Sequence, residues 1–402
     1  MNRTKTEKVC SVLIVAAFLG FIFGLGLLSA YKMLTDYRDY SYYENRSLAA
    51  FPEVERESVL DGTFFSGVED WLRDHAAKRD GVLTYHTLLN MDILRRPVVN
   101  ETVIGDGLLL PYNPPEVVDA DDAALRAGIA SDRLRSHADT AEKYGGKFIY
   151  VAVPCQYVYY EDAYPWYLNS RGEYTKASSA ALFGALDAKG VEYIDMAKVF
   201  DSLGHRPEFS STIDNHFSIF GAYETYRAIM ERYNALSGDA LPILSDGDYT
   251  VTTLPNRYIG SRTRKLLGLW ESDEKLSVIV PNEDIPFTRW NYGSDTPGSP
   301  TVYSMPADEN EDVLYQLYMG GDCSETKIAT DRPELPSVLV YGDSFTNAVE
   351  SLIWYDFDTM YSVDLRHYNE KTIEEVIADM KPELVVCIRD YEQLIMLDAN
   401  GQ

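Results

Sequence analysis

The feature that constrains this chain most is an uncharged apolar segment near its N-terminus. From Val9 to Tyr31 there is no charged residue, a run of about 23 positions that is long enough to cross a bilayer as a helix. We expect a single-pass signal anchor over residues 9–31, preceded by a short cytoplasmic tail at 1–8. The rest of the chain would then lie on the extracellular side of the cell membrane.

The charges beside this segment favour the same orientation, but only weakly. Arg3, Lys5 and Lys8 precede it, whereas Lys32 and further basic residues follow it. A cleaved signal peptide is the alternative, although Leu28-Ser29-Ala30 matches a cleavage site only in part. The length of the segment favours the uncleaved anchor.

Composition excludes several classes of function. The 402 residues carry a formal net charge of -27, without the clustered Lys and Arg that a nucleic-acid-binding surface needs. Thirty tyrosines suit either half-buried packing or sugar stacking. Gly145-Gly146 and Gly320-Gly321 fit ordinary turns or helix ends rather than nucleotide-binding loops, so we expect no cofactor.

The four cysteines do not form a scaffold. No CxxC pair and no Cys/His spacing of the zinc kind occurs, so we expect no metal site. Cys10 lies in the apolar segment, which leaves three thiols. Cys155 and Cys387 each close an apparent strand and are the better candidates for one disulfide.

The remaining chain alternates between helical and extended patterns. Helical spacing from Asp121 to Tyr144, with apolar Leu125, Ile129, Leu134 and Ala141, ends at Gly145 and is followed by an apolar strand at 148–153. A second unit has a helix over Ala177–Ala188 and a strand at 191–194. Ser218 caps a predicted helix to Leu236, and the last strands are predicted at 338–341, 360–363 and 384–388, with a helix whose capping box is Thr372 and Glu375.

These patterns divide the chain into segments. Residues 32–115 form a linker and N-terminal segment, 116–242 the first part of an α/β domain, 243–332 a β-rich insertion, and 333–402 the second part. Repeated strand–helix alternation with continuous apolar strands predicts a parallel sheet with helices on both faces. Functional sites in such folds lie beyond the carboxyl ends of the strands.

Two motifs fall at that edge. Gly342-Asp343-Ser344 follows an apolar strand and precedes a helix, which would expose the serine hydroxyl near helix-start N–H groups. A serine nucleophile needs a base and an orienting acid, and Asp214-Asn215-His216 offers both just before a helix. Among the other histidines, we expect His75 and His137 in surface helices.

Both motifs resemble those of one protein family. Ile213-Asp214-Asn215-His216-Phe217-Ser218-Ile219-Phe220-Gly221-Ala222 resembles the Asp-His-His-Trp-Thr-x-x-Gly-Ala signature of the DHHW family, and Tyr341-Gly342-Asp343-Ser344-Phe345 resembles its Gly-Asp-Ser-Phe block. An N-terminal span, Glu44-Asn45-Arg46-Ser47-Leu48 and Val363-Asp364-Leu365-Arg366 are similar in kind and order. DHHW proteins look like relatives of the alginate O-acetyltransferases, which implies an SGNH-hydrolase-like α/β fold.

The resemblance also implies residue roles. Ser344 would be the nucleophile and its backbone N–H an oxyanion donor, with His216 as general base and Asp214 as its orienter. Asn215 and Phe217 stand where the family has His and Trp, so these two residues and Arg366 are candidates for substrate binding.

The implied function is a membrane-anchored O-acyltransferase, with acetyl as the expected group, acting on a cell-surface or exported polysaccharide through an acyl-enzyme. The acyl donor is unknown, and a membrane protein partner could supply it. Two alternatives stay open: a carbohydrate esterase that uses the same triad, and a non-catalytic glycan-binding or assembly protein on an SGNH scaffold.

Overall fold

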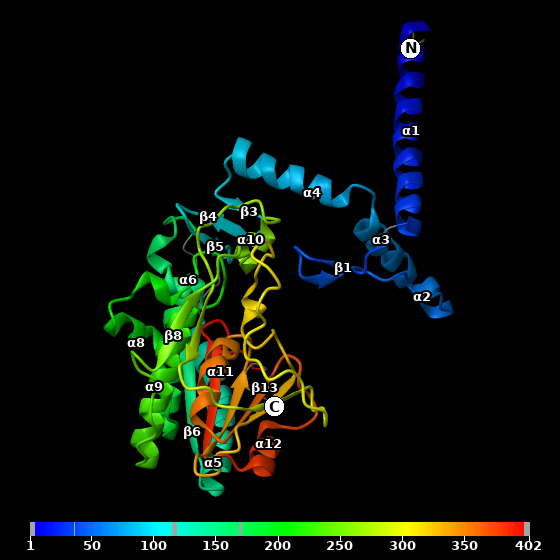
Figure 1. Ribbon diagram of the computed structural model, residues 1–402. Coiled ribbons are helices and arrows are strands. Elements are labelled where there is room, and N and C mark those ends of the chain that lie inside the picture. The colour runs from blue at the N-terminus through cyan, green and yellow to red at the C-terminus, as the bar shows by residue number, and fades with distance from the viewer. Residues whose placement is uncertain (1–4, 36, 115–118, 169–170, 398–402) are drawn as a thin grey trace. The chain divides into compact units, whose positions relative to one another are not determined.

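The structure, a computed structural model, describes residues 5–35, 37–114, 119–168 and 171–397 (Figure 1). Arg3 and the other residues at 1–4 of the expected cytoplasmic tail lie outside the described residues. The chain divides into two compact units. The first contains Met1–Asn100 and Arg264–Trp270, and the second contains Glu101–Thr263 and Glu271–Gln402.

The first unit is mostly helical and begins with α1 (Lys5–Thr35), which includes the whole uncharged segment. Among the described residues, α1 is the one helix long and apolar enough to cross a membrane, a property that signal sequences share. The other elements are β1 (Tyr40–Ser41), β2 (Arg46–Ser47), α2 (Arg56–Asp61), α3 (Thr63–His75), α4 (Arg79–Leu88), the π-helix η1 (Leu89–Ile93) and β3 (Val98–Val99).

The second unit is built on a seven-stranded sheet with the order β10-β11-β13-β12-β14-β6-β7. The five strands from β13 to β7 run parallel, while β10 and β11 join antiparallel at one edge. The bounds are β6 (Lys147–Val153), β7 (Tyr193–Asp195), β10 (Thr288–Asn291), β11 (Glu325–Ala329), β12 (Ser337–Gly342), β13 (Thr359–Asp364) and β14 (Leu384–Asp390).

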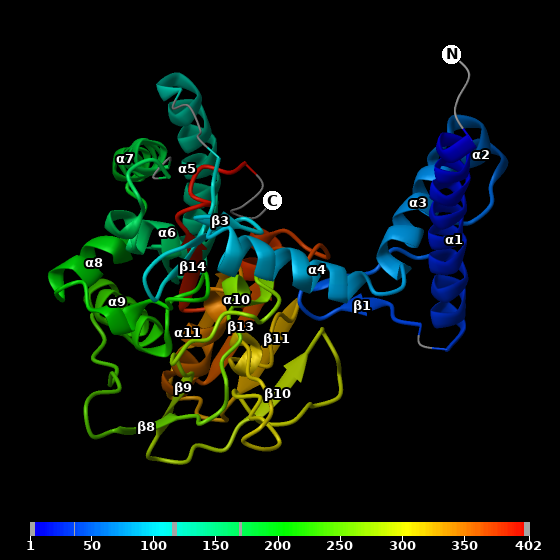
Figure 2. The same ribbon diagram turned by 90° about the horizontal axis from the view of Figure 1, so that it is seen from above.

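Helices cover both faces of this sheet (Figure 2). On one face α5 packs against β6, β14, α7 and α12, and on the other face α9 and α11 pack against β6 and β12. The longer helices are α5 (Ala120–Lys143), α7 (Gly172–Lys189), α8 (Met196–Ser202), α9 (Ile219–Ser237), α11 (Thr346–Ile353) and α12 (Ile373–Met380). The predicted α/β class with a mostly parallel sheet is confirmed.

Short elements complete the second unit. They are β4 (Thr102–Ile104), β5 (Leu109–Pro111), α6 (Gln156–Tyr159), η2 (Glu161–Ala163), η3 (Pro207–Phe209), β8 (Tyr249–Thr253), β9 (Ser277–Pro281), η4 (Tyr315–Leu317) and η5 (Trp354–Asp356), together with α10 (Ser261–Lys265), of which the last two residues belong to the first unit. The region expected to be β-rich supplies β8 to β11. Of these, β8 and β9 pair with each other, whereas β10 and β11 extend the main sheet.

The expected positions of two histidines are wrong. His137 is fully buried in α5, where its Nδ1 lies 2.6 Å from the Tyr341 hydroxyl, and burial lowers the pKa of His137 to about 4. His75 is also buried, in α3. Both side chains are structural parts of their units rather than surface groups.

The expected disulfide is also absent from the structure. Cys155 and Cys387 are both buried free thiols. In the register of β14 and β6, Cys387 lies opposite Tyr150, so Cys155 is five residues farther along the chain. That offset places the two Cα atoms well beyond the roughly 7 Å that a disulfide tolerates.

Candidate active site

Ser344 lies in a tight turn at the carboxyl end of β12, the central strand of the seven-stranded sheet. The turn passes close to the neighbouring strand, because a Cβ on Gly342 would lie 2.1 Å from the carbonyl oxygen of Ile388 in β14. Only glycine fits this approach. The Asp343 carboxylate then accepts the Phe345 N–H at 2.9 Å, and α11 begins at Thr346, which leaves Ser344 half-buried at the sheet edge.

A buried arginine supports the same turn. Arg389, at the end of β14, is 3% exposed, and its Nη1 lies 3.4 Å from Asp343 Oδ2. A charge this deeply buried needs an opposite partner. The ion pair therefore fixes the Asp343 side chain, and with it the backbone next to Ser344.

Asp214 and His216 lie in a loop that is closed like a hairpin. Ser210 and Phe217 form an isolated antiparallel bridge, and the Ser211 hydroxyl accepts the Asp214 N–H at 2.9 Å. As predicted, Ser218 then caps α9 by accepting N–H groups of the first turn. The cap fixes where the helix starts, so His216 is held two residues before Ser218.

These elements bring the three predicted residues into one hydrogen-bonded series. His216 Nδ1 lies 2.6 Å from Asp214 Oδ1, and His216 Nε2 lies 2.7 Å from Ser344 Oγ. A carboxylate only accepts, so Nδ1 carries the proton and Nε2 is free to accept the Ser344 O–H. Asp214 and His216 are 3% and 8% exposed, and the serine hydroxyl is therefore the open end of the series.

Asp214 is held as a charged carboxylate despite its burial. Burial alone would raise its pKa, but the electrostatic interaction with His216 and the hydrogen bonds from His216 and from the Ser261 N–H outweigh it and lower the pKa of Asp214 to about 2. The Ser261 N–H donates to Oδ2 at 2.6 Å. The residue before it is a glycine for steric reasons, since a Cβ on Gly260 would lie 2.3 Å from the Ile213 carbonyl oxygen.

An aromatic ring lies flat against the imidazole. Tyr315 in η4 stacks on His216 with ring centroids 3.8 Å apart and an angle of 4° between the planes. Burial raises the pKa of Tyr315 well above its usual value, so its phenol stays neutral. The ring fixes the plane of the imidazole and covers one of its faces.

The two residues that differ from the family signature have different positions. The Asn215 amide nitrogen lies 3.4 Å from His216 Nε2, and its oxygen accepts the Ser261 O–H at 2.8 Å. Phe217 is 1% exposed and packs edge-on against Phe345. Phe217 is therefore a core residue, which contradicts its expected contact with substrate.

Arg366 lies at the same edge of the sheet, after β13. It donates to Asp364 and pairs with Asp322 at 2.9 Å, while Asp322 also accepts from the Asn347 amide in α11. Asp322, Asp364 and His367 have ligand atoms within 4.8 Å of one another, as a metal site would. The Arg366 guanidinium pairs with both carboxylates, so we interpret this cluster as an ion-pair network.

The Ser344 N–H remains available as a donor. Among the described residues no backbone or side-chain acceptor takes it, and it belongs to the turn that carries the hydroxyl. It could therefore donate to an oxygen atom of a group bound at Ser344 Oγ.

The chain is similar to one known protein family and to several solved structures. A family model described as DHHW protein matches residues 44–147. The predicted resemblance to the DHHW family is confirmed. The DHHW match covers about a quarter of the chain and includes Glu44 and Arg46, but it ends before Asp214, His216 and Ser344. No curated protein matches the chain.

Solved structures match the fold over a longer stretch. The chain is 18% identical to Bacillus cereus PatB1, solved with a sulfonyl adduct, with a TM-score of 0.60 over 73% of this chain and 94% of that one. A DHHW family protein from Eubacterium siraeum is 17% identical, with a TM-score of 0.55 over 74% and 93%. The O-acetyltransferase domain of Pseudomonas putida AlgJ has 15% identity and a TM-score of 0.44 over 73% and 92%. The predicted SGNH-like fold class is confirmed.

Proposed function

We propose that this protein is a membrane-anchored, extracytoplasmic O-acyltransferase that moves an acyl group, expected to be acetyl, onto hydroxyl groups of a cell-surface or exported polysaccharide. The observation that carries the proposal is the series Asp214–His216–Ser344, with contacts of 2.6 and 2.7 Å at the carboxyl edge of the sheet. The apolar helix α1 supports the anchor, and the DHHW resemblance supports the polysaccharide acceptor.

In the first half-reaction Ser344 accepts the acyl group. His216 Nε2 takes the hydroxyl proton while Oγ attacks the carbonyl carbon of the donor, and the Ser344 N–H stabilises the resulting oxyanion. Asp214 stabilises the imidazolium and keeps its orientation. The proton on Nε2 then passes to the leaving group, the bond to it breaks, and an acyl ester on Ser344 remains.

In the second half-reaction the same groups act in reverse. His216 removes the proton of an acceptor hydroxyl, whose oxygen attacks the acyl-Ser344 ester, and Nε2 returns the proton to Ser344 Oγ. A sugar hydroxyl as acceptor gives a transferase, and water gives an esterase. The esterase is therefore the second candidate, and it needs the same three residues.

The test is to trap the intermediate on the full chain in detergent or nanodiscs. With a chromogenic acetyl ester and no acceptor, we expect one acetyl group per chain, located on Ser344 by peptide mass spectrometry. Adding a soluble oligosaccharide should move the acetyl group to sugar. A sulfonyl fluoride, chosen because PatB1 has been solved with a sulfonyl adduct, should block both steps.

Each outcome of this test has a definite meaning. Acetate release that exceeds transfer at every acceptor concentration would select the esterase. A chain that takes up neither acetyl nor sulfonyl groups at Ser344, yet binds glycan, would overturn the enzyme assignment in favour of the non-catalytic scaffold.

A second prediction concerns Tyr315. Replacing the stacked ring in Tyr315→Leu should lower kcat/KM for the chromogenic ester by about tenfold, because one aromatic stack is worth roughly 0.5–1.5 kcal/mol. Tyr315→Phe is the matched control: it keeps the ring and removes a buried hydroxyl that has no partner among the described residues. The Phe variant should match the wild type, and an equal loss in both variants would show that the hydroxyl matters rather than the ring.

A further inference from the structure

The first unit exposes an apolar stripe along one helix. Val82, Tyr85, Leu89 and Ile93 are 65%, 80%, 43% and 73% exposed. They follow one another at intervals of three or four residues through α4 and η1, so they share one face. An amphipathic helix normally buries its apolar face. An apolar face that stays exposed to solvent indicates a surface that binds an apolar partner.

The start of this helix is fixed to the end of the apolar segment in α1. The Ser29 hydroxyl accepts the Ala77 N–H at 2.9 Å. Ser29 is 8% exposed, although most side chains of α1 are exposed to solvent. Ser29 lies two residues before Tyr31, where the uncharged segment ends. Ala77 lies two residues before Arg79, where α4 begins. The stripe therefore starts close to the end of the apolar segment, where α1 would leave a membrane.

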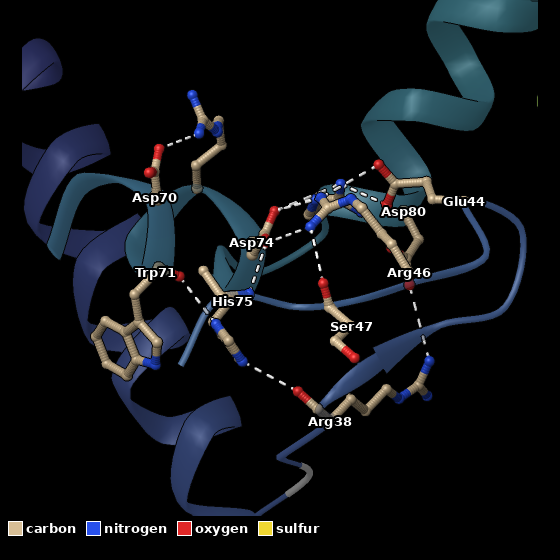
Figure 3. A network of polar contacts seen from close by, with 12 residues as sticks. Arg38, Glu44, Arg46, Ser47, Asp70, Trp71, Asp74, His75 and Asp80 are labelled. Carbon is tan, nitrogen blue, oxygen red and sulfur yellow. Dashed lines mark hydrogen bonds and ion pairs between the residues drawn. The ribbon is translucent and has the colours of Figure 1, made fainter. Parts of the chain in front are cut away.

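A polar network locks this junction (Figure 3). Asp74 accepts two hydrogen bonds from the Arg46 guanidinium, both of 2.7 Å, and one from the Ala49 N–H at 2.9 Å. Its hydrogen bonds with Arg46 hold the pKa of Asp74 well below its usual range. Arg79 donates to Glu44 from the first turn of α4, so α4 is tied to the segment that follows α1.

His75 adds a second tie in the same place. Its Nδ1 lies 2.9 Å from the Trp71 carbonyl oxygen within α3, and its Nε2 lies 3.0 Å from the Arg38 carbonyl oxygen just after α1. Figure 3 shows the imidazole reaching between these two groups. The end of α3 and the start of α4 therefore cannot swing freely about the end of α1.

Orientation and charge both suit a lipid surface. In both ribbon views α4 runs across the direction of α1 rather than alongside it (Figures 1 and 2). A helix placed across a span lies along the membrane plane. Exposed Lys78 precedes the stripe and exposed Arg95 and Arg96 follow it, as in interfacial helices that contact anionic headgroups.

We propose that the face formed by Val82, Tyr85, Leu89 and Ile93 lies in the interfacial layer of the membrane that α1 crosses. The inference rests on α1 being retained as an anchor and does not depend on the acyl-transfer chemistry. It gives the first unit a second attachment to the bilayer, so that the chain following α1 is held at the headgroup level rather than on a free tether.

The test uses the full chain in nanodiscs that contain anionic lipid. In a background with Cys10→Ser and Cys323→Ser, an environment-sensitive NBD fluorophore is attached at Tyr85→Cys. The control is Asp80→Cys, which is exposed but lies on the opposite side of the same helix, facing the polar network. Nitroxide lipids labelled near the headgroup should quench the Tyr85 site at least about threefold more than the Asp80 site, since interfacial helices sit at that depth.

Three results would separate the possibilities. A Tyr85 label that stays in water, or one that is shielded but not quenched by lipid, would overturn the inference; the latter result would mean that the stripe packs on protein. A label at Leu19→Cys in α1 tests the anchor separately. Quenching at Leu19 without quenching at Tyr85 would leave the anchor standing and reject only the interfacial face.

Discussion

Ser344→Ala should lower acetyl transfer by about 10⁴-fold or more, because the hydroxyl that forms the acyl-enzyme is then absent. The fold should survive, since the side chain is half-buried at the sheet edge and, within the part of the chain that the structure describes, its hydroxyl bonds only to His216. Initial rates with the acetyl ester and an oligosaccharide acceptor measure the loss. Thermal unfolding of the same samples checks that the variant is folded.

A matched serine in the same region supplies the control. Ser351 lies in α11, the helix that follows Ser344, and its buried hydroxyl donates to the Ala348 carbonyl of that helix. Ser351→Ala should therefore keep near-wild-type transfer. Activity retained in Ser344→Ala, or lost equally in both variants, would contradict the assignment of Ser344 as nucleophile.

The sheet could be predicted from sequence because the patterns of its central strands are typical of buried strands. β12 and β14 are continuous apolar runs that end in charged or glycine residues, and their predicted positions, 338–341 and 384–388, fall inside the observed strands. Local patterns also located the Ser218 cap and the Thr372–Glu375 capping box. Such signals depend on neighbouring residues alone, which is why one sequence suffices to find them.

Packing partners could not be predicted in the same way. The apolar spacing that predicts the α5 helix includes Leu125 and Ile129, but these two residues are 63% and 39% exposed. The buried face carries alanines instead, together with Leu134 and His137. Small side chains let α5 approach β6 and α7 closely, and that requirement comes from the neighbours rather than from α5 itself.

The pairing of β10 and β11 with the main sheet could not be predicted for the same reason. Their short polar and apolar sequences predict strands but contain nothing that selects a pairing partner. β11 pairs with β13, an element that follows it by about 30 residues, and so becomes part of the sheet rather than of a separate lobe. Pairing between distant segments is decided by the assembled core.

The candidate site divides along similar lines. Ser344, His216 and Asp214 could be selected because each needs only a local pattern, a turn after a strand or an acid two residues before a histidine. Ser261 and Tyr315, which hold the acid and cover the base, come from segments with no motif. Arg389 left a weak signal, a charge at the end of a buried apolar strand, and that pattern would have found it.

Asp214→Asn should be nearly as damaging as loss of the nucleophile, with a drop of about 10³- to 10⁴-fold in kcat/KM. The carboxylate accepts from His216 Nδ1 and the His216 N–H on one oxygen and from the Ser261 N–H on the other. An asparagine must turn its NH₂ group toward one of these donors. One orientation opposes Ser261, and the other favours the imidazole tautomer that cannot accept the serine proton.

Asp214→Asn should also change how the stability of the fold depends on pH. The pKa of Asp214 is lowered to about 2 in the folded chain, against about 3.9 when unfolded, so the carboxylate contributes about 2 to 3 kcal/mol above pH 4 that is lost as the pH falls toward 2. Asp214→Asn should therefore be less stable at pH 7 and lose less stability between pH 4 and pH 2. Denaturant unfolding at both pH values measures this, and Ser344→Ala should keep the wild-type dependence. A folded Asp214→Asn chain with more than about a tenth of the wild-type rate would remove Asp214 from the mechanism, since replacing a carboxylate that orients the base should cause a much larger loss of rate.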